Sequence, residues 1–80
     1  MPKLLYVAAT GSQDQTRCSL PFHLAANGAA AAGYEAAVVL AGDATELLKA
    51  EVRDPVRGVG IPPLAELFEA CRDRGVRIHV

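Results

Sequence analysis

Cys18 and the turn before it are the part of this 80-residue sequence best suited to chemistry. The turn Thr10-Gly11-Ser12-Gln13-Asp14 follows a short apolar run and precedes an alanine-rich segment that favours helix. A thiol in the first turns of that helix would lie near the positive end of the helix dipole, and Arg17 adds a positive charge. Both effects lower a thiol pKa and favour the nucleophilic thiolate, provided that the side chain is partly exposed. The sequence therefore predicts Cys18 as a candidate sulfur acceptor, with a small buried residue as the alternative.

Polar residues at two strand-to-helix turns form a second candidate, a ligand-binding crevice. Open α/β sheets place their ligands at the carboxyl ends of the strands, where both turns are expected. The residues expected there are Thr10, Gly11, Ser12, Asp14, Arg17, Gly42 and Asp43. Two carboxylates in one crevice could perform acid–base work, but Asp14 and Asp43 both stand where helix N-caps are expected. Arg17 could hold an anionic sulfur species, or lie in solvent or at an interface.

The second cysteine and the two histidines have structural interpretations. Cys71 falls on an apolar helical stripe, which predicts a core position. His23 is five residues from Cys18, about 140° around a helix, so the two side chains are expected to point apart. His79 supports no specific role. The spacing of these residues matches no metal-ligand pattern, and we expect neither a metal nor a cofactor.

The elements that must position these residues alternate between strand and helix. We expect strands over Lys3–Ala9, Tyr34–Leu40 and Val76–Val80, helices over Thr16–Ala32, Ala44–Glu51 and about Pro62–Arg74, and a loop over Val52–Gly60. The last helix has the strongest pattern, because Leu64, Leu67, Phe68 and Cys71 follow the i, i+3, i+4, i+7 spacing of a buried face.

Three local features refine these expectations. Pro21 removes a backbone hydrogen bond, so regular helix is expected to begin only near Ser19 or Leu20. Gly28, in the middle of the same helix, is expected to let that helix lie close to the sheet. Asp43 and Glu46 have the spacing of a capping-box-like pair at the start of the next helix.

The order β-α-β-α-α-β predicts one α/β domain over residues 1–80, with a parallel sheet and right-handed crossovers. We expect a three-layer arrangement with helices on both faces of the sheet. Two exposed sheet edges and a small core make a stable monomer unfavourable, so a homo-oligomer is expected. The last strand meets the end of the sequence without a following turn, which suggests a shortened domain.

Composition excludes several classes of function. A net charge of −1 and an aromatic content of 5% offer no electrostatic surface or stacking platform for nucleic acid. No apolar run approaches the ~20 residues of a membrane helix. Two cysteines in a sequence without a signal peptide are expected to be reduced thiols in the cytoplasm.

The succession of short motifs resembles the DsrE/DsrF-like family of small sulfur-relay proteins. The matching segments are Thr10-Gly11-Ser12, Asp14 and Arg17 with Leu20-Pro21-Phe22, Gly33-Tyr34-Glu35, Gly42-Asp43, and Gly60-Ile61-Pro62-Pro63-Leu64. The resemblance implies a flavodoxin-like α/β fold, cytoplasmic oligomers, sulfur-donor or acceptor proteins as partners, and a persulfide-carrying cysteine in the active branches. That cysteine typically follows the strand corresponding to Arg77–Val80, so the resemblance implies that this sequence lacks the segment carrying it.

Two other functions stay open from the residues alone. A hydroxyl-bearing, glycine-containing turn at a helix start is typical of phosphate sites, which favours a nucleotide- or flavin-binding module. However, the sequence lacks both glycine-rich phosphate motifs, and Asp14 places negative charge where a phosphate would lie. The alternative is a noncatalytic subunit with a role in assembly.

Overall fold

A computed structural model of the chain describes residues 3–80 and contains a three-stranded parallel sheet. The strands are β1 (Lys3–Ala8), β2 (Glu35–Leu40) and β3 (Arg77–His79), in the order β1-β2-β3. In the register, Tyr6 pairs with Val38, which in turn pairs with Ile78. The predicted α/β class and parallel sheet are therefore confirmed, consistent with a small flavodoxin-like fold.

Five helical segments connect the strands. They are α1 (Gln15–His23), a π-helical continuation η1 (Leu24–Ala30), a 3₁₀ helix η2 (Gly42–Leu48), α2 (Ala50–Arg53) and α3 (Leu64–Asp73). The predicted last helix is confirmed: Leu64, Leu67 and Cys71 are buried, and Phe68 packs partly buried beside them. Gly75, at a φ of 75°, takes the chain from α3 towards β3. In the part of the chain that is described, no helix has the length and apolar character needed to cross a bilayer.

The expected delay of the first helix by Pro21 is wrong. α1 begins at Gln15, with Asp14 as its N-cap, and Pro21 lies inside it. Proline has no N–H to donate to the carbonyl of Arg17, four residues earlier. The wider turns of η1 begin three residues after the proline.

Two further local expectations are also wrong. Gly28 is exposed, and a Cβ built on it meets nothing within 4 Å, so it does not serve a close approach of the helix to the sheet. Asp43 does not cap a helix over 44–51: η2 begins at Gly42, its N-cap is Ala41, and no side chain caps it. Val52 and Arg53, the first two residues of the segment expected to be a loop, belong to helix α2.

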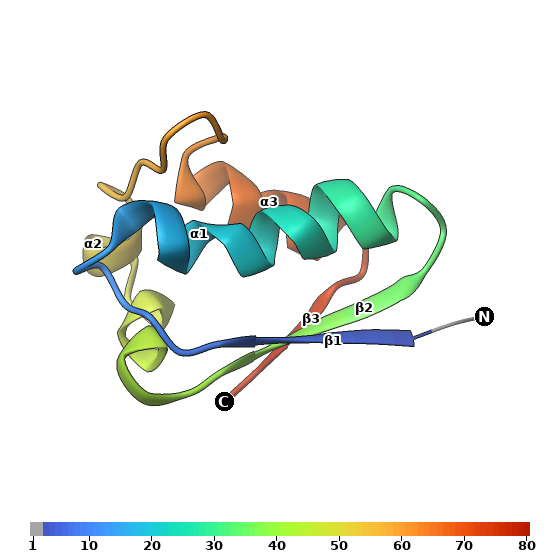
Figure 1. Cartoon of the computed structure of the whole chain (residues 1–80), viewed down its shortest axis with the longest axis horizontal. Coiled ribbons are helices and arrows are strands. Elements are labelled where there is room, and N and C mark those ends of the chain that lie inside the picture. The colour runs from blue at the N-terminus through green and yellow to red at the C-terminus, as the bar shows by residue number, and fades with distance from the viewer. Residues whose placement is uncertain (1–2) are drawn as a thin grey trace.

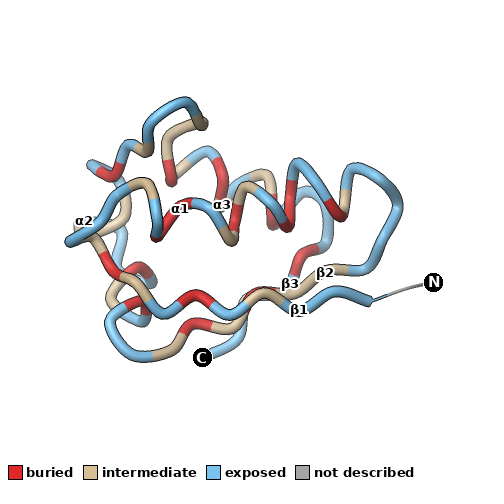
Figure 2. The backbone as a smooth tube through the Cα atoms, viewed as in Figure 1, coloured by how far each residue is buried: buried red, intermediate tan, exposed pale blue. Residues whose placement is uncertain are grey.

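The helices lie over one face of the sheet, so the described residues form two of the three expected layers (Figure 1). From β1 to β2 to β3 the chain moves in one direction across the sheet. Because crossovers between parallel strands have the same handedness, every helix then lies on the same side of the sheet. The core lies between the layers, where the buried positions of strands and helices face each other (Figure 2). Its largest fully buried side chains include Phe22, Leu40, Leu47, Leu64 and Leu67.

The opposite face of the sheet is open and apolar. Leu5 and Val7 of β1 are 63% and 62% exposed, and Ala37 and Val39 of β2 share this face by strand alternation. Parallel sheets normally have both faces covered. The fold thus leaves apolar sheet surface in contact with solvent.

Candidate functional site

The two strand-to-helix turns meet at the carboxyl edge of the sheet. Ser12 donates two hydrogen bonds to Oε1 of Glu46, one from its backbone N–H and one from its hydroxyl, each 2.8 Å long. Beside this contact, Nε2 of Gln13 donates to Oδ2 of Asp43 at 3.2 Å. These bonds lower the pKa of the Glu46 carboxyl, because both Ser12 groups stabilise its charged form.

Gly11 is buried at the centre of this junction. A Cβ at that position would lie 2.5 Å from Oε1 of Glu46 and 2.6 Å from the carbonyl oxygen of Asp43. The two turns are therefore in direct contact here, with no open crevice between them. The structure brings Gly11, Ser12 and Asp43 together from the predicted set, with Gly42 next to them in the same turn.

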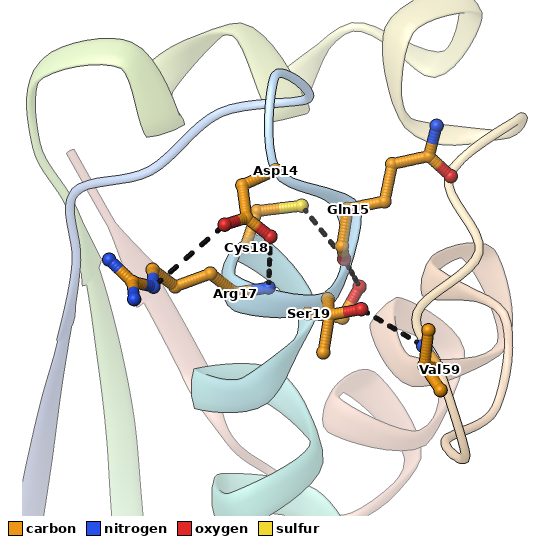
Figure 3. A network of polar contacts seen from close by, with 7 residues as sticks. Asp14, Gln15, Arg17, Cys18, Ser19 and Val59 are labelled. Carbon is orange, nitrogen blue, oxygen red and sulfur yellow. Dashed lines mark hydrogen bonds and ion pairs between the residues drawn. The ribbon is translucent and has the colours of Figure 1, made fainter.

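Asp14 and Arg17 lie on the outer side of the first turn of α1 (Figure 3). Oδ1 of Asp14 accepts a 3.0 Å hydrogen bond from the backbone N–H of Arg17, which confirms the N-cap interpretation of this aspartate. Nε of Arg17 lies 3.9 Å from Oδ2 of the same carboxylate. Thr10 and Arg17 border a groove of about 320 Å³ between β1 and α1, which Gly11, Ser12 and Asp43 do not line.

Cys18 is buried, which agrees with its alternative interpretation as a small buried residue and not with the partial exposure that a reactive thiol requires. Its side chain is 1% exposed, and its Sγ donates to the backbone carbonyl of Gln15 at 3.4 Å (Figure 3). Burial raises the pKa of the Cys18 thiol, and the negative charge of Asp14 raises it further, although a hydrogen bond with Ser19 acts in the opposite direction. The expected lowering of this pKa by the helix end and Arg17 is therefore wrong.

The same turn of α1 is tied to the segment before α3. The backbone N–H of Arg57 donates to Oε1 of Gln15 at 2.9 Å, and that of Val59 donates to Oγ1 of Thr16 at 3.0 Å. Gly58, between them, lies against Thr16. These contacts join residues more than 40 positions apart and hold the first turn of α1 against the 57–59 loop.

The remaining candidates occupy structural positions. Cys71 is fully buried, which confirms its predicted place in the core, and burial raises the pKa of its thiol to about 11. Nδ1 of His23 lies 3.2 Å from Nδ2 of the Asn27 side chain. His79 is exposed on β3. Within residues 3–80, no three His, Cys, Asp or Glu side chains are grouped as a metal site would require.

The chemistry available at the carboxyl edge is dominated by carboxylates. Asp14, Asp43 and Glu46 all border the turn, and the Ser12 donors that would face an anion are already bonded to Glu46. A phosphate placed there would meet negative charge. The junction is suited to holding the two turns together.

Sequence reasoning missed the contact between Ser12 and Glu46, because no local spacing connects residues 34 positions apart. It also missed the attachment of Gln15 and Thr16 to the 57–59 loop. A signal for the first contact was present in the topology: the carboxyl ends of adjacent parallel strands meet at one sheet edge, so a donor in one turn and a carboxylate in the next can pair.

Comparison with known proteins identifies a family for this chain. The model of the DsrE/DsrF-like family matches residues 2–80. No curated protein and no solved structure matches the chain. The family match spans nearly the whole sequence and agrees with the parallel α/β architecture, so this chain belongs to the DsrE/DsrF-like family.

Proposed function

We propose that this chain is a noncatalytic subunit of a cytoplasmic sulfur-relay system, and that it acts by assembling with copies of itself and with sulfur-transferring proteins. Membership of the DsrE/DsrF-like family supplies the sulfur-relay context. The observation that carries the proposal is the burial of both thiols, since Cys18 is 1% and Cys71 0% exposed.

Burial opposes sulfur transfer in two ways. The outer sulfur of a donor persulfide must reach the accepting thiolate, and neither Sγ is open to such an approach in this state. The raised pKa values of Cys18 and Cys71 also keep both groups as neutral thiols near pH 7, and the neutral thiol is a poor nucleophile.

Apolar surface supports the assembly part of the proposal. The open face of the sheet carries Leu5 and Val7, and further exposed leucines lie on α1 and at the start of η1. Exposed apolar patches of this kind mark interaction surfaces in small proteins. A homo-oligomer would remove part of this apolar surface from water. The free energy of this burial would add to the small stabilisation that the core of an 80-residue chain provides.

Thiol labelling tests the proposal. The native protein is treated with iodoacetamide near pH 7, or with a low-molecular-weight persulfide, and the products are read by mass. We expect neither Cys18 nor Cys71 to react in the folded protein, and both to be alkylated in guanidinium chloride. Added sulfur on the wild type that disappears in Cys18→Ser and persists in the matched Cys71→Ser variant would contradict a noncatalytic role.

The second candidate is a persulfide carrier at Cys18, favoured by the position of this residue on α1 beside the carboxyl edge of β1. In that reaction the Cys18 thiolate would attack the outer sulfur of the donor persulfide. The donor S–S bond would break, a Cys18 persulfide would form, and the donor would leave as a thiolate. Arg17 and the polar residues of the turns would then border the bound sulfur species.

This carrier function requires the first turn of α1 to open. Thr16→Val removes the hydroxyl that holds the amide of Val59 while keeping the shape of the side chain. If Cys18 works as a carrier, this variant should be alkylated faster at Cys18 and unchanged at Cys71. Equal, slow labelling of both thiols would leave Cys18 as a packing residue.

A further inference from the structure

Asn27 and Gly28 form the pair of residues in this sequence best suited to rearrange without an enzyme. Asn27 is the only asparagine of the sequence, and both residues are exposed. The backbone nitrogen that follows an asparagine can close a five-membered ring on the side-chain amide carbon. A glycine at the following position leaves the approach to that carbon open, because it has no side chain.

The segment that holds this pair is a loosened helix. η1 (Leu24–Ala30) is π-helical, and such segments are rare and frequently lie at functional sites. Gly28 weakens the helix further, because glycine loses more backbone entropy on folding than any other residue. A Cβ built on Gly28 meets nothing within 4 Å, so no distant segment of the described chain packs against this position. We therefore expect η1 to open locally at its exposed side.

His23 contacts the group that would leave in such a rearrangement. Nδ1 of its ring is 3.2 Å from Nδ2 of Asn27. A general acid must lie within about 3.2 Å of the atom that it protonates, and histidine is the side chain best suited to donate a proton near neutral pH. The planar amide nitrogen accepts a proton poorly, but it becomes a basic amine once the amide carbon has been attacked. The contact therefore places a proton donor at the leaving nitrogen.

We propose that Asn27 is a self-modification site, at which the chain converts its own asparagine to isoaspartate and aspartate with His23 as the general acid. The backbone nitrogen of Gly28 loses its proton to water and attacks Cγ of Asn27, which forms an N–C bond. His23 protonates Nδ2, the Cγ–Nδ2 bond breaks, and ammonia leaves a succinimide behind. Water then opens the ring at either carbonyl, and His23 regains its proton from solvent. The net reaction consumes one water and releases one ammonia, without any oxidant or reductant.

The helix controls the rate of the attack. In a π-helix each N–H is directed towards the carbonyl five residues earlier, so the nitrogen of Gly28 reaches Cγ only when η1 opens. The rotation that is needed takes place about the backbone bonds between Asn27 and Gly28. These bonds follow the Asn27 side chain in the chain, so Nδ2 keeps its contact with His23 while the backbone turns.

The two products differ in their effect on η1. Aspartate keeps the backbone unchanged and places a carboxylate beside His23. Isoaspartate adds a carbon atom to the main chain, which shifts the register of the helical hydrogen bonds. Ala26 and Ala29, on either side of the site, are buried in the core. Formation of isoaspartate should therefore loosen the packing of η1, and the folded chain should lose stability with age.

Incubation of the native protein near pH 7, followed by peptide mapping by mass, tests the site. We expect deamidation at Asn27, with isoaspartate identified by enzymatic methylation of the product. His23→Gln keeps a polar side chain that cannot act as an acid, and it should slow the native reaction about tenfold, less than a fully enclosed general acid contributes. The matched control is His79→Gln, an exposed histidine on β3, which should leave the rate unchanged.

The unfolded chain and amide exchange separate proton donation from an effect on the helix. In guanidinium chloride the His23 contact is absent, so wild type and His23→Gln should react at equal rates. Exchange of the Gly28 amide proton measures the opening of η1, and it should be the same in both native proteins. Gly28→Ala should slow the reaction in the native and the unfolded chain, because the added methyl group hinders ring closure.

Three results would overturn the proposal. Equal native rates for wild type and His23→Gln would exclude His23 as the acid. A slower reaction of His23→Gln with equally slower exchange at Gly28 would assign the effect to helix stability. No conversion of native Asn27, over a period in which the unfolded chain is converted, would exclude the site itself. None of these measurements involves Cys18 or Cys71, so they are independent of the proposed subunit role.

Discussion

Ser12 and Glu46, 34 residues apart, are joined by two hydrogen bonds that end on the same carboxylate oxygen. Ser12 belongs to the turn between β1 and α1, and Glu46 belongs to η2, which follows β2. The pair therefore fastens the carboxyl ends of two adjacent strands to each other. It also uses the donors that would otherwise be available to an anion at this turn.

Glu46→Gln should lower the melting temperature near neutral pH, because hydrogen bonds to a charged acceptor are stronger than those to a neutral amide. The pKa of Glu46 is lowered from 4.5 in the folded state. As the pH falls below 4.5, the unfolded carboxyl takes up its proton first, and the stabilisation is lost as the pH passes through the lower folded pKa. The difference in melting temperature between wild type and Glu46→Gln should therefore shrink over this range.

Thermal unfolding monitored by circular dichroism at several pH values checks this expectation. Glu69→Gln, on the exposed side of α3, controls for the loss of a carboxylate as such. Equal melting temperatures of wild type and Glu46→Gln at pH 7 would mean that the contact with Ser12 adds nothing to stability.

Two glycine-to-alanine substitutions should have opposite effects. Gly11→Ala places a methyl group against the backbone carbonyl of Asp43 and the carboxylate of Glu46, and overpacking of this kind costs ~1–3 kcal/mol. Gly28→Ala adds a methyl group in open space within a helical segment, so a gain of ~0.5–1 kcal/mol is expected from reduced chain entropy. Urea unfolding of both variants measures the two changes, and a stabilising Gly11→Ala would show that the turns are not in close contact.

The two phenylalanine rings of the core should differ in their contribution to stability. Phe22 is fully buried, whereas Phe68 is partly buried, and their ring centroids are 4.7 Å apart. Phe22→Ala should cost ~3–5 kcal/mol in the free energy of unfolding, as for other buried aromatic residues. Phe68→Ala should cost less, because water and the guanidinium of Arg53, 4.4 Å from the ring centroid, already share its surface. Denaturant midpoints compare the two variants, and an equal or larger loss for Phe68→Ala would contradict this order.

Alkaline pH should destabilise the protein through Cys71. Burial raises the pKa of this thiol from 9.0 to about 11. Between these values the unfolded thiol has lost its proton while the folded one retains it, so stability falls as the pH rises through this window. The loss attributable to Cys71 should be on the order of 2 kcal/mol by the upper end of the window.

Cys71→Val removes the ionisation and keeps an apolar side chain of similar size. The fall in unfolding free energy between pH 9 and 11 should therefore be smaller in this variant than in the wild type. Parallel curves for the two proteins over this range would show that Cys71 does not titrate differently in the folded state.

Elements defined by local pattern could be predicted from the sequence. Helix α3 follows from the spacing of Leu64, Leu67 and Cys71, and its burial matches that spacing. Asp14 caps α1 because a short acidic side chain can accept a hydrogen bond from an amide three residues later. The three strands were expected in their places, and no bound differs from the expected one by more than one residue. These features depend on residues that are close to one another in the chain, so they can be predicted from the sequence.

Other features were decided only by the tertiary structure. Glu46 stands three residues after Asp43, which is the spacing of a capping pair at the start of a helix. It bonds to Ser12 instead, because the neighbouring turn offers two donors at once. Cys18 stands where a reactive thiol would be expected, but the packing of α1 buries it and raises its pKa. Leu5 is an apolar residue of a type common in buried strands. It is nevertheless exposed, because the strand order places every described helix on the other face of the sheet. Each of these outcomes depends on which segments contact each other in the folded chain. The spacing of residues within one segment does not determine those contacts.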